Sequence, residues 1–423
     1  MSAQLSPPFN RYKHNVNICE LDEDSLICVF QYLSLEDLGR LICVCKRFYR
    51  VINIHVYSKR SAYLLRTGHQ RYRFSHVPGR DLHSDFSYRK RIRLFENWRY
   101  GRYNEKQFFY HQMLYFSQIL LERRWLYMTH RGQLRAHERL VNNERVLNGK
   151  ASWILGKSRD YDINWMEKNG DLFFAGRTDG SCFVYNCDSG FYRKQQLTEE
   201  PITSVDFDAK LFVCTTKSKS TSFWTGFNDI NDVMLEKKQQ LNEGYQTIKL
   251  SPSGANQLAA GKYSDREKKA LKLIDVERSL TSTLNSPTRA VYQVMWKDSN
   301  TILTGNFDTT FRVIDTRTAQ DESVWTDPYD ASVYCFDYDG AYSVLCGMKY
   351  NFRVNLYDLR IPKRCIQMYF SSKKHSHYSP VYSIAADCSQ LFLVTDHDLR
   401  VLNFDANNKE KKDYTYDLVN CLY

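Results

Sequence analysis

The chain has 423 residues, more than one compact hydrophobic core normally holds, so several domains or one large repeat architecture are expected. Its hydrophobic content of 43% and charged content of 25% are those of an ordinary globular protein and exclude wholesale disorder. The net charge of +11 is uneven: Lys46–Lys106 carries 16 Lys and Arg against 4 Asp and Glu, a balance of +12, which leaves −1 for the remainder. Electrostatic arguments therefore concern that segment.

The sequence carries no pattern typical of a membrane or secreted protein. No apolar run approaches the ~18 residues needed to cross a membrane, and Met1–Tyr12 lacks the apolar region of a signal peptide. The 12 cysteines are scattered without a C-x-x-C pair, and many lie in apolar strand-like runs, where cysteine behaves as a small buried hydrophobe. We expect an intracellular soluble protein, cytoplasmic, nuclear or both, with no metal.

The N-terminal part predicts a small helical module. Residues 1–15, with two consecutive prolines, predict a flexible arm, and helical periodicity follows within residues 16–62. Asp22 can cap the first helix, and Ser34 opens a capping-box pattern before the second. The apolar positions on the expected helix faces are Leu26, Ile27, Phe30 and Leu33, then Leu38, Leu41, Ile42, Cys45 and Phe48, then Val51, Ile54 and Tyr57. Three short helices bury little surface alone, so this module needs a partner or a neighbouring domain.

Residues 63–107 are interpreted as a basic connector. Within them, Tyr88–Tyr103 interleaves aromatic residues with Arg and Lys. Such a stretch could be a nucleic-acid platform, with rings that stack on bases and cations that contact phosphates. It could instead pack Phe95 and Trp98 against the following domain while its arginines stay solvated. We favour this second interpretation because the stretch lies between two predicted domains.

From about Phe108 onward the pattern changes to short strands of period two. A tight-turn residue followed by alternating apolar positions and a final polar residue recurs six times. These copies end at Asn186, Thr225, Asp275, Asp315, Asp358 and Asp405, which are 39, 50, 40, 43 and 47 residues apart. This is the spacing of WD-type propeller blades with loop insertions.

A second element precedes each copy by about 20 residues. It reads Val-Tyr-x-apolar at Val291, Val333 and Val381, with a looser match at Ile202. Further apolar strands lie between the two elements, so each unit offers four short strands. A seventh unit fits into Tyr110–Leu140. Residues 108–410 therefore predict a β-propeller, with seven blades as the favoured count, followed by a tail over residues 411–423.

The segment Leu21–Phe48 resembles an F-box, the helical motif that docks onto the Skp adaptor of cullin-based ubiquitin ligases. The matching runs are Leu26–Leu33, Leu38–Leu41 and Val44–Phe48, whereas the usual Leu-Pro at the start is here Leu21-Asp22. The whole chain resembles the dactylin type of F-box/WD-repeat proteins, on the segments Glu96–Arg102, Thr304–Thr309 and Ser379–Tyr382. The implied fold class is mainly β, a WD-repeat β-propeller preceded by a small all-α F-box module.

The resemblance implies a non-catalytic adaptor, the substrate-recognition subunit of a Skp–cullin–F-box E3 ubiquitin ligase. The F-box would dock the Skp adaptor and cullin, and the propeller would bind a target protein, promoting its ubiquitination and proteasomal degradation. Neither nucleic acid nor a membrane is an expected partner. The residues implied in docking are Leu21, Leu26, Ile27, Phe30, Leu33, Leu38, Leu41, Val44 and Phe48. The alternative function is a WD-repeat scaffold that binds RNA or another polyanion through the basic connector.

Aromatic residues recur at matching positions in the later blades. Tyr292, Tyr334 and Tyr382 each follow the inner-strand valine, and Phe307 and Tyr350 precede the turns of two blades. In a propeller these positions lie near one rim of the central channel, where they could form a target-binding surface. The alternative is a purely structural role, in which the rings pack between blades.

Catalysis finds little support in the sequence. It shows no Gly-rich phosphate loop, no nucleophile elbow and no histidines at metal-ligand spacing, and His375-x-His377 lies in a Ser/Lys-rich stretch. We therefore expect no catalytic residue, cofactor or metal.

Overall fold

The computed structural model describes residues 17–61, 64–66, 86–110, 117–139, 147–229, 232–252, 256–263, 268–371 and 379–405. The predicted arm over residues 1–15 and the tail over residues 411–423 lie outside this range, as do residues 67–85 of the predicted connector. The chain divides into two compact units, residues 1–64 with 87–92 and residues 65–86 with 93–423. None of the helices within the described ranges is both long and apolar enough to span a membrane.

The first unit is helical. Its elements are η1 (Ile18–Glu20), α1 (Glu23–Phe30), α2 (Leu35–Leu41), α3 (Lys46–Val51), η2 (Ile52–Val56) and α4 (Tyr57–Ser61). The Asp22 carboxylate accepts a hydrogen bond from the Ser25 N–H at 2.7 Å, and the Ser34 hydroxyl accepts one from the Asp37 N–H at 3.1 Å. Both predicted caps are thus confirmed, because each satisfies an N–H at the start of a helix that has no intrahelical acceptor.

The core of this unit forms where the helix faces meet. Phe30 and Phe48 are buried with their rings edge-on at 5.0 Å, and Leu26 and Leu38 are fully buried around them. The Arg60 guanidinium donates hydrogen bonds to main-chain carbonyls that follow α1, including that of Leu33 at 2.7 Å. It therefore satisfies carbonyls at a helix end that would otherwise lack donors.

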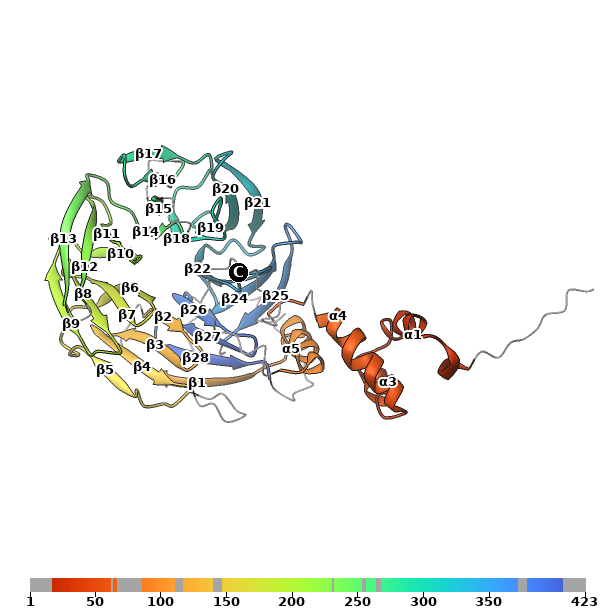
Figure 1. Cartoon of the computed structure of the whole chain (residues 1–423). Helices are drawn as coiled ribbons and strands as arrows, with labels where there is room; N and C mark the ends of the chain where they lie inside the picture. Colours follow the sequence, from red (N-terminus) through yellow and green to blue (C-terminus); the bar gives the residue numbers. More distant parts are fainter. Residues whose placement is uncertain are drawn as a thin grey trace, which may run out of the picture. The chain divides into compact units, whose positions relative to one another are not determined.

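The second unit is a propeller: its described residues form seven four-stranded antiparallel sheets, arranged as blades around a central axis (Figure 1). The innermost strands are β2 (Ile119–Leu121), β6 (Ile163–Asn169), β10 (Ile202–Phe207), β14 (Thr247–Leu250), β18 (Val291–Trp296), β22 (Val333–Tyr338) and β26 (Ser383–Ala386). The second strands are β3 (Trp125–His130), β7 (Leu172–Arg177), β11 (Leu211–Thr216), β15 (Gln257–Gly261), β19 (Thr301–Asn306), β23 (Ser343–Met348) and β27 (Gln390–Val394). The third strands are β4 (Gln133–Glu138), β8 (Ser181–Asn186), β12 (Thr221–Asp229), β16 (Leu271–Asp275), β20 (Thr310–Asp315), β24 (Arg353–Asp358) and β28 (Asp398–Asn403). The outer strands are β5 (Trp153–Leu155), β9 (Tyr192–Gln196), β13 (Asp232–Leu241), β17 (Leu280–Thr283), β21 (Gln320–Thr326), β25 (Cys365–Phe370) and β1 (Asn104–Tyr110).

The seven-bladed architecture and the strand assignment of the repeats are confirmed. Four of the repeat ends, Asn186, Asp275, Asp315 and Asp358, are the last residues of third strands, whereas Asp405 lies two residues beyond β28. The Val-Tyr-x-apolar elements at Val291 and Val333 begin inner strands, and the one at Val381 leads into β26. Thr225 lies inside β12, which runs on to Asp229. The three aspartates that end strands act as turn formers, because each accepts hydrogen bonds from backbone N–H groups just after its strand.

One blade is built from both ends of the propeller sequence. Strand β1 pairs antiparallel with β28, with Asn104 opposite Asn403 and Lys106 opposite Val401. The last blade is thus completed by a strand that precedes all the others, which closes the ring by hydrogen bonds. The antiparallel pairing of β1 with β28 therefore holds the first and last parts of the propeller sequence together in one sheet.

Helix α5 (Tyr88–Tyr100) precedes β1, and its second half belongs to the propeller unit. Trp98 is fully buried, stacks on Phe404 at 3.6 Å and donates to the Cys388 carbonyl at 2.9 Å. Asn97 donates to the Phe404 carbonyl at 2.7 Å. These contacts hold the C-terminal end of α5, just before β1, against the last blade.

Glycines at the second strands let neighbouring blades approach closely. A Cβ on Gly261 would lie 2.6 Å from the Cβ of Val291, and one on Gly176 would lie 2.3 Å from a methyl carbon of Ile202. No side chain fits at either position. The first residue of the next inner strand therefore packs directly against the glycine.

Candidate functional site

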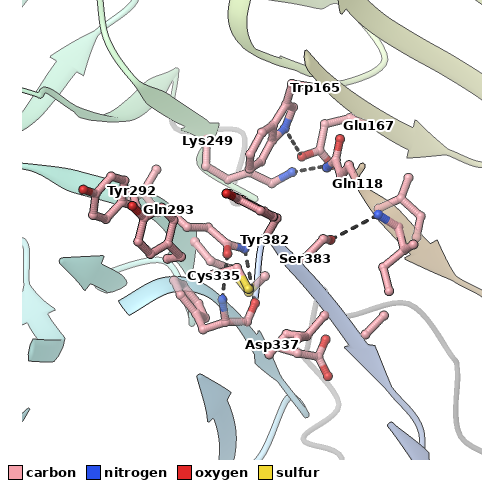
Figure 2. A pocket seen from close by; sticks show the side chains of 18 of the residues that line it. Gln118, Trp165, Glu167, Lys249, Tyr292, Gln293, Cys335, Asp337, Tyr382 and Ser383 are labelled. Carbon is pink, nitrogen blue, oxygen red and sulfur yellow. Dashed lines mark hydrogen bonds and ion pairs between the residues drawn. The ribbon is translucent and has the colours of Figure 1, made fainter. Parts of the chain in front are cut away.

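The inner strands of all seven blades line a central cavity of about 590 Å³ (Figure 2). A set of side chains from the starts of these strands lines one end of it. They are Ser117, Asn164, Thr203, Gln246, Tyr292, Tyr334 and Tyr382, one from each blade. This end is therefore polar over the first four blades and aromatic over the last three.

A repeated backbone irregularity aims these side chains. In β6, β10, β18 and β22 the pairing register skips one residue, namely Asn164, Thr203, Tyr292 and Tyr334 respectively. A bulge leaves its extra residue outside the ladder and redirects its side chain. The position that follows the inner-strand valine in the sequence thus faces the cavity because of the bulge.

The aromatic residues predicted at the rim come together. Tyr292 and Tyr334 stack at 4.6 Å with planes 10° apart, and Tyr382 stands edge-on to Tyr334 at 6.0 Å and 86°. Phe307 lies 6.4 Å from Tyr292, and the Lys349 ammonium links Phe307 to Tyr350, at 5.9 and 5.0 Å from their ring centroids.

The same cluster contains Tyr263, which the sequence analysis missed. Its ring lies 6.2 Å from Tyr292 and 6.5 Å from Phe307. Tyr263 follows Gly261 by two residues, as Phe307 follows Gly305, so an alignment on the glycine near the end of each second strand would have found it. We call Tyr263, Tyr292, Phe307, Tyr334, Tyr350 and Tyr382 the aromatic patch.

The patch combines mutual packing with exposure. Tyr263 and Phe307 are each 40% exposed, and the other four rings are half-buried. Burial and the neighbouring Tyr334 raise the pKa of Tyr292, and burial with a hydrogen bond to Asp396 raises the pKa of Tyr382. These two phenols therefore stay neutral at physiological pH. A hydrogen bond with Tyr350 raises the pKa of Lys349, which keeps its charge.

The other end of the channel carries paired charges. The Lys249 ammonium lies 2.8 Å from the Glu167 carboxylate (Figure 2). It also lies 3.0 Å from the Asp206 carboxylate. Lys168 pairs with Glu122 at 2.5 Å. Because these cations are compensated within the channel, this end offers little net charge to a ligand.

Side chains of the inner strands also fasten each blade to the next. A hydrogen bond between a side chain on or beside one inner strand and the backbone of the neighbouring one occurs at every junction around the ring. The pairs are Gln118–Met166, Asn164–Ile202, Ser204–Ile248, Trp296–Lys249, Gln293–Phe336, Cys335–Val381 and Ser383–Ile119. This circuit holds the channel wall in place, which favours a preorganised binding surface.

The predicted docking residues of the helical unit separate into three groups. Leu26, Phe30, Leu38 and Phe48 are buried in the unit's own core; Leu21, Ile27, Leu33 and Leu41 are partly buried; and Val44 is 62% exposed. Exposed apolar side chains that the sequence analysis did not select include Val29 and Tyr32, the latter 84% exposed. In the sequence, such residues can be recognised as apolar residues that do not fit the periodic apolar face of the helical segment.

The aromatic rings of the basic stretch are largely internal. Trp98 and Tyr103 are buried, and the Tyr103 hydroxyl donates to the Phe370 carbonyl at 2.9 Å. Arg93 pairs with Asp405 at 2.8 Å. Neither ring is exposed for base stacking, which weakens the case for a nucleic-acid platform.

Over the described residues, no three His, Cys, Asp or Glu side chains are placed so that they could hold a metal ion. His375-x-His377 lies outside those residues.

Comparisons with known proteins agree with both halves of the chain. The family profile of the F-box domain matches residues 18–58. F-box/WD repeat-containing protein 4 of Mus musculus is 25% identical over 395 residues, which cover 91% of this chain and 92% of that protein. The Homo sapiens protein of the same name is 24% identical over 391 residues, with the same two coverages.

Among solved structures, the computationally designed Ika8 protein superposes with a TM-score of 0.51 at 13% identity, over 69% of this chain and 97% of that one. At this identity the likeness concerns the fold alone. The F-box match, the seven blades and the similarity along nearly the whole chain together show an F-box followed by a seven-bladed propeller, an arrangement similar to that of the F-box/WD-repeat proteins of the dactylin type.

Proposed function

We propose that this protein is the substrate receptor of a Skp–cullin–F-box ubiquitin ligase. F-box/WD-repeat proteins generally have this role. The observation that carries the proposal is the pairing of an F-box, which leaves apolar side chains exposed, with a propeller whose channel mouth bears the aromatic patch.

In this function the chain itself performs no covalent chemistry. The F-box attaches the propeller to the ligase core, and the propeller holds a target protein near the ubiquitin-charged conjugating enzyme. The acceleration then comes from proximity, because a bound target meets the reactive thioester at a high effective concentration. Ubiquitination of the target, followed by proteasomal degradation, is the expected outcome.

The exposed apolar side chains of the helical unit support the docking part of the proposal. Val29, Tyr32 and Val44 are exposed, and Leu21 and Leu33 are partly exposed beside the core. Burying such side chains against a partner would contribute roughly 1.5–3 kcal/mol each. The buried residues Phe30 and Phe48 would instead act by holding the helices in place.

Affinity purification of the full-length protein tests the proposal. The wild type should recover the Skp adaptor and cullin, and nuclease treatment should not release them. The double variant Tyr32→Ser, Val44→Asp should lose both partners while the protein stays folded. Ile154→Asp is a matched control, because it places a charge at an exposed apolar position of the propeller, 52% exposed.

Failure of the wild type to recover the Skp adaptor would overturn the proposal. Recovery of RNA that weakens steeply with salt, in place of the adaptor, would favour the polyanion-binding scaffold.

A further inference from the structure

The charge of the aromatic patch comes from two lysines. Lys349 lies over the rings of Tyr350 and Phe307, and Lys217 lies over the ring of Tyr263 at 5.1 Å. Among the described residues, neither ammonium has a carboxylate oxygen within 4.0 Å. Two lysines that are close to them in sequence or structure are neutralised: Lys219 pairs with Glu200 at 3.1 Å and Lys262 with Glu243 at 3.3 Å. Lys349 and Lys217 therefore present ammonium groups without a paired carboxylate beside apolar surface.

The carboxylates close to the patch are already engaged. Asp396 hydrogen-bonds Tyr382, and Glu243 accepts a hydrogen bond from the Tyr245 hydroxyl at 2.7 Å in addition to its contact with Lys262. The remaining residues of the channel mouth carry hydroxyls and amides. A cationic ligand would meet Lys349 in the place where a cation contacts the rings, so the charge pattern disfavours it.

Three buried arginines near the same end are paired with carboxylates, which limits their availability to an anionic ligand. Arg353 bonds Asp327 at 2.6 Å, Arg400 bonds Asp398 at 2.8 Å, and Arg312 bonds two aspartates, one of them Asp321 at 2.6 Å. Guanidinium groups are the preferred bidentate partners of phosphate, and these three are occupied. An ammonium group can bind a carboxylate or a phosphate, so it is the absence of a guanidinium partner at these three positions that favours a carboxylate here.

The shape of the patch suits an apolar side chain. The stacked Tyr292 and Tyr334 rings and the perpendicular Tyr382 ring form a corner at the channel mouth. Tyrosine gives a large contact area for little loss of side-chain entropy. The hydrogen-bonded wall beneath it keeps the corner in one geometry.

We propose that the aromatic patch recognises an unmodified target segment in which an apolar or aromatic side chain stands beside a carboxylate. The apolar side chain packs into the corner of Tyr292, Tyr334 and Tyr382, and the Asp or Glu carboxylate contacts Lys349. This inference rests on the proposed function and specifies the class of target that the receptor takes.

A peptide selection tests this assignment. The full-length protein is immobilised together with the Skp adaptor and is challenged with a phage-displayed library of short random peptides. The expected result is enrichment of sequences with an apolar or aromatic residue next to Asp or Glu. Enrichment of Lys- or Arg-containing peptides, or no enrichment at all, would overturn the inference.

Variants connect the selected peptide to the named residues. Lys349→Met keeps the aliphatic stem and removes the charge, and it should weaken the selected peptide about tenfold, as loss of a charge-assisted contact does. Replacing the peptide's Glu by Gln should weaken binding to the wild type by a similar factor and have little further effect on Lys349→Met. Tyr334→Ala should reduce binding of both peptides. The control Lys219→Met, which removes a lysine paired with Glu200, should change neither.

A phosphorylated peptide separates the two sources of negative charge. With phosphoserine in place of Glu, affinity equal to or below that of the Glu peptide supports the carboxylate assignment. A gain of more than about tenfold, corresponding to ~1.4 kcal/mol, would overturn it in favour of phosphate.

The two proposals can fail separately. Recovery of the Skp adaptor is measured on the same preparations, and peptide binding is repeated without the adaptor. Adaptor recovery without peptide enrichment refutes only the target class. Peptide binding of the expected kind by a protein that never recovers the adaptor supports the target class and refutes the ligase function.

Discussion

The rings of Tyr292 and Tyr334 stack with their centroids 4.6 Å apart, although the two residues belong to neighbouring blades. Each is the extra residue of a bulge at the start of its inner strand. The stack therefore depends on the blade-to-blade spacing and on two equivalent backbone irregularities. The stack also partly shields the Tyr292 side chain from water, which affects how the stability of the protein depends on pH.

Stability should fall as the pH rises above the ordinary tyrosine value. Burial raises the pKa of Tyr292 above its usual 10.0, so the folded protein keeps a proton that the unfolded chain releases. The contribution of this residue to stability is fully present below about pH 10 and is lost as the pH rises beyond it. Urea unfolding at several alkaline pH values should show a smaller decline for Tyr292→Phe than for the wild type. Equal slopes would contradict the burial of this hydroxyl.

Gly261→Ala should destabilise the propeller by about 1–3 kcal/mol, as overpacking of a tight contact does. The added methyl group would lie 2.6 Å from the Cβ of Val291, so the inner strand that carries Tyr292 must move. Urea denaturation measures the loss. Gly149→Ala is the matched control and should be nearly neutral, because no atom lies within 4 Å of a Cβ at that position. Equal stability of the two variants would show that the blades separate without cost.

Arg353→Met should destabilise the propeller by roughly 3–5 kcal/mol, the usual result of leaving a buried charge without its partner. Arg353 and Asp327 are both fully buried and lie 2.6 Å apart. Arg317→Met removes an arginine that is 70% exposed and pairs with Asp315, and it should have little effect because exposed pairs are screened by solvent. Denaturant unfolding of the two variants compares the pairs directly. Similar losses for both would contradict the interpretation.

Phe30→Ala should destabilise the helical unit by about 3–5 kcal/mol, because it leaves a cavity beside Phe48. Tyr32→Ala, at a side chain that is 84% exposed, should change stability by less than about 0.5 kcal/mol. Calorimetry of the full-length protein, with the helical and propeller transitions followed separately, distinguishes the two variants. A neutral Phe30→Ala would mean that this residue is not part of the core, and the variant would then be a clean probe of docking.

Local chemistry made several features predictable from sequence. Asp22 and Ser34 indicate where helices begin, because their side chains accept hydrogen bonds from backbone N–H groups within the next turn. Asp315 and Asp358 mark strand ends for a similar reason, since each bonds an N–H two residues later. Hydrogen bonds between residues so close in the chain can be predicted from a single sequence. The regular spacing of the strand ends then indicated the propeller.

Other features depend on residues that are distant in the chain. The resemblance to an F-box placed Phe30 and Val44 in one docking set, but the packing of the helices buries the first and exposes the second. Tyr263 joins the aromatic patch through contacts with Tyr292 and Phe307, whose positions depend on how neighbouring blades meet. Neither outcome follows from the spacing of apolar residues, because burial is decided by what lies on the other side of each face.

The sequence by itself determined the two-part organisation, the helix caps, the repeating strand-and-turn unit and four of the five tyrosines of the aromatic patch, since all of these rest on hydrogen bonds and alternation within a few residues. Only the tertiary structure decided that β1 completes the last blade, that bulges aim Tyr292 and Tyr334 into the channel, and that Lys349 lies against the rings. The physical reason is that ring closure and side-chain direction are set by contacts between blades, which a single strand does not encode.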